Sequence, residues 1–113
     1  MSVQTAKIVT IENSAGYQKL LSGVPETSGM KSGCVILKPG ESVGAHSTGD
    51  REEAIVILEG VVQVCLEGSR DMTARQNQLV YIPPRTTHDM KNTGLGVSRY
   101  MYVVVPVVNS QLK

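Results

Sequence analysis

The sequence predicts an all-β fold of antiparallel strands, closed into a sandwich or barrel. Short apolar and β-branched segments recur at even spacing, and Gly, Pro, Asn and Asp separate them. No long segment repeats its apolar residues with the period of a helix. At 113 residues, with 41% hydrophobic and 19% charged residues, the chain can bury one core and is too short for two. We therefore expect residues 1–113 to form a single domain.

The N-terminal segment, residues 1–30, is expected to contribute a strand and one helical turn. Residues 5–11 are β-branched and alternate weakly, which predicts a strand. Ser14 can cap a single helical turn that runs to Leu21, and Gly23 then ends the turn.

The rest of the chain is expected to consist of strands and turns. The predicted strands cover residues 34–37, 42–46, 53–58, 61–66, 72–74, 79–82, 86–91 and 97–108. Pro106 indicates an edge or a bulge near the end of the last strand. Residues 109–113 are predicted to be a short C-terminal tail.

Two of these strands are apolar almost without interruption, at residues 54–58 and 100–108. A strand of a small antiparallel barrel should keep one face in water. Apolar residues on both faces therefore predict that something covers the outside, and we expect a homodimer. The alternative is that the terminal segments cover these strands.

The composition argues against several classes of partner. The net charge is +1 with both signs interspersed, which lacks the clustered basic face of a nucleic-acid-binding protein. No apolar run reaches the length of a membrane span, and the first residues do not resemble a secretory signal. We therefore expect a cytoplasmic protein that binds neither nucleic acid nor membrane.

Cys34 and Cys65 lack the spacing of a zinc ribbon or a redox pair. Both lie in apolar, strand-like sequence, which favours reduced, buried thiols. A disulfide between facing strands is the alternative.

Two imidazoles and a carboxylate are candidates for a metal site. His46 precedes the acidic pair Glu52 and Glu53, and His88 follows later in the chain. In a strand, Glu53 shares its face with the inward residue Ile55, whereas Glu52 points the other way or lies in the turn. Two imidazoles and one carboxylate in a β-rich domain predict a transition-metal site with open coordination positions.

The stretch from Gly40 to Gly60 has a specific spacing. Five residues separate Gly40 from His46, and six separate Glu53 from Gly60. This spacing resembles the first motif of single-domain cupins, which are double-stranded β-helix (jelly-roll) barrels. The family usually has a second histidine where this chain has Thr48.

Pro83, His88 and Asn92 resemble the second cupin motif, so the resemblance spans residues 40–92. Asn77 replaces the usual first glycine, and asparagine tolerates the left-handed backbone better than most residues. Arg85 stands where another glycine is expected and would place a cation near the barrel mouth.

The resemblance implies a ligand set of His46, Glu53 and His88 for one divalent transition metal: iron, manganese, nickel or zinc. Thr48 would hydrogen-bond a metal-bound water, or else it marks a site that has lost its metal. Met90 shares the face of His88, so Thr48, Met90 and Arg85 are expected near the substrate.

The resemblance does not select one reaction. One hypothesis is a metal-dependent enzyme of the dioxygenase, decarboxylase, lyase or isomerase type that acts on a small organic molecule. A second is a non-catalytic module that binds a metal or a small ligand. A third is a purely structural barrel, against which the retained ligand set argues. No catalytic residue is assigned, because Asp89 is expected on the wrong face and Glu52 is expected to be solvated.

Overall fold

The computed structural model describes residues 4–13 and 16–108, and these contain nine strands and no helix. The strands are β1 (Tyr17–Ser22), β2 (Lys31–Leu37), β3 (His46–Ser47), β4 (Arg51–Glu59), β5 (Val61–Leu66), β6 (Met72–Arg75), β7 (Leu79–Ile82), β8 (Thr87–Lys91) and β9 (Ser98–Pro106). In the described part of the chain, nothing helical is long and apolar enough to cross a membrane. The predicted all-β class is confirmed.

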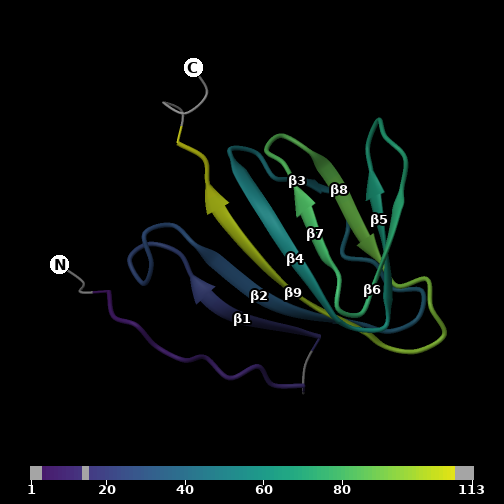
Figure 1. The fold of residues 1–113 in the computed structure, drawn as a ribbon, viewed down its shortest axis with the longest axis horizontal. Helices are drawn as coiled ribbons and strands as arrows, with labels where there is room; N and C mark the ends of the chain where they lie inside the picture. Colours follow the sequence, from purple (N-terminus) through teal and green to yellow (C-terminus); the bar gives the residue numbers. More distant parts are fainter. Residues whose placement is uncertain (1–3, 14–15, 109–113) are drawn as a thin grey trace.

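The strands form two sheets that face each other (Figure 1). One sheet has five strands in the order β1-β2-β9-β4-β7, and the other has four in the order β3-β8-β5-β6. All neighbouring strands are antiparallel. Because β3 and β8 belong to the four-stranded sheet and β4 belongs to the five-stranded sheet, residue 53 approaches residues 46 and 88 from the opposite side of the barrel.

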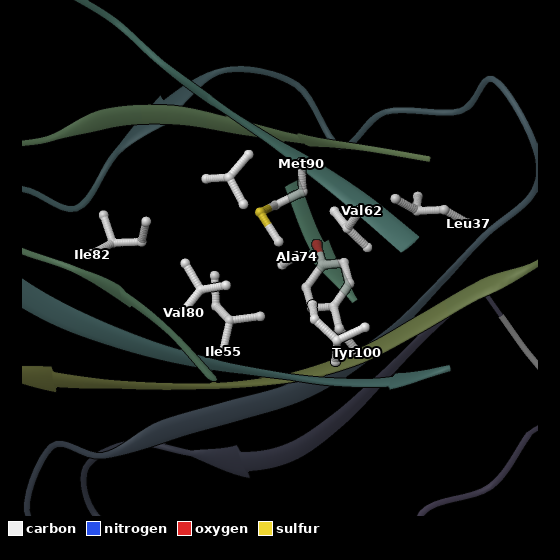
Figure 2. Close-up of a cluster of buried hydrophobic side chains, with 10 residues drawn as sticks. Leu37, Ile55, Val62, Ala74, Val80, Ile82, Met90 and Tyr100 are labelled. Carbon is white, nitrogen blue, oxygen red and sulfur yellow. The ribbon is translucent and has the colours of Figure 1, made fainter. Parts of the chain in front are cut away.

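The core lies between the sheets, where the inward residues of each strand meet. Along β4, Ile55 and Ile57 are completely buried, while Ala54, Val56 and Leu58, which alternate with them, are only partly buried. Met90 on β8 and Tyr100 on β9 point into the same interior from the two sheets (Figure 2). This alternation confirms that Glu53 shares the inner face with Ile55, and that Met90 shares it with His88.

The N-terminal predictions are wrong in the described residues. Residues 5–11 form no strand, and residues 17–22 form β1 instead of a helical turn. β1 pairs with β2 (Tyr17 lies opposite Val35), so sheet pairing overrides the local helical signal. The proposed cap, Ser14, lies outside the described residues.

Two other predictions need adjustment. The predicted strand 42–46 is reduced to a single bridge at Ser42 and the short strand β3. Cys34 and Cys65 are free thiols, as favoured, but only Cys34 is fully buried.

The motif positions that are not candidate ligands shape the loops. Asn77 and Arg85 both have a left-handed backbone, with φ of 72° and 52°, which explains why glycine is usual at both positions. Asn92 is buried, and its amide donates hydrogen bonds to the carbonyls of Leu37 and Gly96. These residues hold the ends of the strands that carry the candidate site.

Candidate metal centre

Three side chains from three strands converge between the sheets. His46 on β3 and His88 on β8 lie directly opposite each other in the ladder, with ring centroids 4.5 Å apart. Glu53 reaches them from β4 in the other sheet. One donor atom from each of the three residues lies within 4.8 Å of the others, a spacing that a single cation can bridge.

Backbone carbonyls orient both imidazoles. The Nδ1 atom of His46 lies 3.0 Å from the Gly44 carbonyl oxygen, and that of His88 lies 3.2 Å from the Thr86 carbonyl oxygen. Because a carbonyl only accepts hydrogen bonds, each Nδ1 carries a proton, which leaves Nε2 as the ring atom that can bind a metal. This arrangement fixes the tautomer of many metal-binding histidines.

The Nε2 atom of His88 is buried and lacks a satisfactory partner. It lies 3.1 Å from Glu53 Oε1, but the approach does not have the geometry of a hydrogen bond, and no other group replaces it. Native proteins rarely leave such an atom unpaired. The Glu53 carboxylate raises the pKa of His88 and outweighs the burial, which lowers it. A cation between Nε2 and the carboxylate would satisfy both groups, so the donor set fits a divalent metal.

Thr48 is buried beside this group, but its hydroxyl is engaged elsewhere. Its Oγ1 donates to the Pro83 carbonyl at 2.7 Å and accepts a hydrogen bond from the Thr86 amide at 3.1 Å. The hydroxyl therefore ties the β3–β4 turn to the β7–β8 turn. Its single proton is already used, so it has none to donate to a metal-bound water.

A cavity of about 280 Å³ opens beside the three candidate ligands. Thr48 and Met90 line it, as expected from the sequence. Arg85 is not among the lining residues, and it instead lies 3.6 Å from Asp50 in an exposed ion pair.

The two other carboxylates considered from the sequence also lie outside the cavity lining. Glu52 accepts a hydrogen bond from the Tyr81 hydroxyl at 2.8 Å, and Asp89 accepts one from the Gly44 amide at 2.9 Å.

Sequence reasoning missed several polar residues that line the cavity, among them Tyr17, Lys31, Arg51 and Tyr102. The hydroxyls of Tyr17 and Tyr102 are 2.8 Å apart. Gly33 makes room for the Tyr102 ring, because a Cβ at that position would lie 2.8 Å from the ring. The period of two along β4 places Arg51 on the face of Glu53 and could have identified it. The other three depend on strand pairing.

Comparisons with known proteins agree with this architecture. The mannose-1-phosphate guanylyltransferase RfbM of Salmonella typhimurium is 32% identical over 62 residues, which are 55% of this chain and 13% of the relative. An RmlC-like cupin family protein from Methanocaldococcus jannaschii superposes with a TM-score of 0.73 at 16% identity, covering 98% of this chain and all of that one. A Thermotoga maritima protein, titled a predicted oxalate decarboxylase, superposes with a TM-score of 0.67 at 16% identity, covering 89% of this chain and all of that one.

The guanylyltransferase match spans only a small part of that enzyme, and the two structural likenesses concern the fold alone. The family model described as "Cupin domain" matches residues 33–105, which include β3 to β8 and all three candidate ligands. With its two facing antiparallel sheets and this match, the chain belongs to the cupin family.

Proposed function

We propose that this cupin is a metal-dependent enzyme acting on a small organic molecule. His46, Glu53 and His88 would hold one divalent iron, manganese, nickel or zinc ion. The supporting observation is the buried, unpartnered Nε2 of His88 beside two further donor atoms within 4.8 Å. Two imidazoles and one carboxylate leave coordination positions open for a ligand.

A bound divalent ion would polarise a substrate oxygen. The protein itself supplies hydrogen-bond donors and an apolar wall. Burial and the hydrogen bond with Tyr17 raise the pKa of Tyr102, so its hydroxyl keeps its proton at neutral pH. One hydroxyl of the Tyr17–Tyr102 pair donates to the other, and the accepting hydroxyl has a free proton to donate to a substrate oxygen. Met90 and Tyr100, both buried, line the cavity and offer it apolar contact.

A second candidate is a non-catalytic module that binds a metal or small ligand. Among the residues that line the cavity, Glu53 is the only carboxylate, and it is also a proposed ligand. The described residues thus supply no separate carboxylate as general base. Metal and ligand binding without turnover of any screened compound would favour this candidate.

We also propose that two copies of the chain pair through the outer face of the five-stranded sheet. Apolar residues cross this face from β7 to β9: Ala54, Val56, Leu79, Tyr81, Met101 and Val103. The segment before β1 bonds to the opposite edge, where Gln18 on β1 contacts the backbone of Thr10 and Glu12. It therefore leaves the β7 side uncovered (Figure 1).

Metal analysis of protein purified without chelator or a nickel column tests the proposed centre. We expect a bound ion, or stabilisation of the metal-free protein by added Fe(II), Mn(II), Ni(II) or Zn(II), because a native-state ligand raises the melting temperature. His46→Ala and Glu53→Gln should each abolish that stabilisation. Glu52→Gln is the matched control, since this neighbouring carboxylate lies outside the cavity.

Less than about a tenth of an equivalent of metal, with no stabilisation by any of the four ions, would reject the proposed function. A Glu52→Gln variant as defective as Glu53→Gln would also contradict the assignment of the ligands.

A further inference from the structure

Given the proposed metal centre, on which this step rests, we infer that the cavity accepts a small dicarboxylate. One carboxylate meets the metal, and Lys31 and Arg51 hold the other. These two cations line the same cavity as the three candidate ligands, and sequence reasoning assigned no role to either.

Strand register places both cations on the inner face beside Glu53. Val104 on β9 pairs with Lys31 on one side and with Glu53 on the other, so the three side chains share one face. With strands about 4.8 Å apart, the Cα atoms of Lys31 and Glu53 are separated by about 10 Å. Arg51 precedes Glu53 by two residues, or about 7 Å along β4. The Cα atoms of both cations therefore lie at a distance from the Cα atom of Glu53 that a short ligand can span.

Lys31 and Arg51 have no carboxylate partner among the described residues. The ion pairs found there involve other cations: Lys7, Arg85, His88 and Arg99. Because Glu53 is the one carboxylate in the cavity lining, two cations face one anion even before a divalent metal is counted. The cavity therefore attracts anions.

The distribution of polar groups favours a ligand with two charged ends. A monocarboxylate on the metal would leave Lys31 and Arg51 without a partner. Val35, Val43 and Val104 also line the cavity and offer apolar contact to a short methylene chain. At about 280 Å³, the cavity is near the lower end of the ligand-pocket range of about 300–1,000 Å³, which suits a ligand of a few carbons.

Calorimetry on the zinc-loaded full chain tests this inference. Succinate and butyrate have the same number of carbons and differ by one carboxylate. Because both cations are solvent-exposed, each contact with the second carboxylate adds only modestly to the binding free energy. We therefore expect succinate to bind roughly three- to tenfold more tightly than butyrate. This preference should disappear in the Lys31→Met/Arg51→Gln double variant.

Arg85→Gln is the control, because it removes one positive charge from an exposed arginine outside the cavity lining. It should keep the succinate preference. Equal affinity for the two acids, or a preference that survives the double variant, would overturn the inference. A zinc titration precedes the acids and separates the two proposals. Failure to bind zinc or any of the other three ions rejects the metal centre, whereas normal zinc binding without a succinate preference rejects only the dicarboxylate.

Discussion

At the scale of single residues, the Thr48 hydroxyl ties two loops together. Thr48→Val keeps the shape and leaves the Pro83 carbonyl and the Thr86 amide without their partner. We expect a loss of about 1–3 kcal/mol in the free energy of unfolding, measured in urea, because buried polar groups would be left unsatisfied. Zinc affinity should change less than about threefold, since this hydroxyl is not expected to contact the metal.

Thr48→His provides the contrast at the same position. It also breaks the two hydrogen bonds, so the metal-free protein should again be less stable. It adds an imidazole where the family usually has one, however, so zinc should bind more tightly. A Thr48→Val variant with more than about tenfold weaker zinc binding would show that the hydroxyl serves the metal after all.

His88 should make the stability of the metal-free protein depend on pH. Its pKa is raised in the folded state, chiefly by the Glu53 carboxylate, above the ordinary 6.5. The imidazolium therefore stabilises the fold fully below that value, and the contribution is lost as pH rises through the folded-state pKa.

We expect wild type to exceed His88→Gln in unfolding free energy by more at about pH 5.5 than at about pH 9, measured in urea. Comparing the two proteins at each pH cancels the titration of other groups. A difference that is constant or grows with pH would contradict the role of Glu53.

At the scale of elements, the turn between β4 and β5 depends on Gly60. Its φ is +79°, and an added Cβ would lie 2.6 Å from the Val97 carbonyl oxygen. Gly68 has a similar φ of +73° with open space around it. Gly68→Ala should therefore cost only the left-handed backbone strain of about 1–2 kcal/mol. Gly60→Ala should cost about 1–3 kcal/mol more, because the backbone at residue 97 must move.

Urea unfolding of both variants measures this difference. Equal losses for Gly60→Ala and Gly68→Ala would show that the backbone at Val97 yields easily and that its contact with residue 60 does not constrain the turn.

The elements that the sequence predicted best are those whose local and tertiary signals agree. Residues 61–66 and 79–82 are rich in apolar and β-branched residues, end at turn residues and form β5 and β7 with the predicted bounds. The failures lie in the N-terminal segment. Residues 5–11 look like a strand but pair with none, and residues 17–22 become a strand because β2 offers them a partner. Such pairing cannot be predicted from local propensity.

The same division applies to the candidate site. The chain has two histidines, and their motif spacing with Glu53 identified the group that the fold brings within 4.8 Å. Lys31 and the Tyr17–Tyr102 pair were missed, because their approach to the cavity depends on the order β1-β2-β9. Arg85 was expected at the barrel mouth, but its left-handed backbone and Asp50 hold it elsewhere.

At the scale of the whole molecule, the apolar outer face of the five-stranded sheet predicts a dimer. Val103→Glu places a charge at the centre of this face, opposite Ala54. We expect light scattering to give twice the monomer mass for wild type and the monomer mass for this variant, because a buried unpaired charge is costly. Thr73→Glu, on an exposed position of β6, should leave the mass unchanged. A monomeric wild type would contradict the proposed pairing.

The strand β1 contributes Tyr17 to the lining of the cavity. It precedes the family match, which begins at residue 33. Tyr17 and Lys31 therefore lie outside the matched segment, whereas His46, Glu53 and His88 lie within it. Under the proposed function, residues before the family match would contribute to the choice of substrate, while residues inside it would hold the metal. Grafting residues 17–31 from another cupin would then change the substrate side of the cavity and leave the metal ligands unchanged.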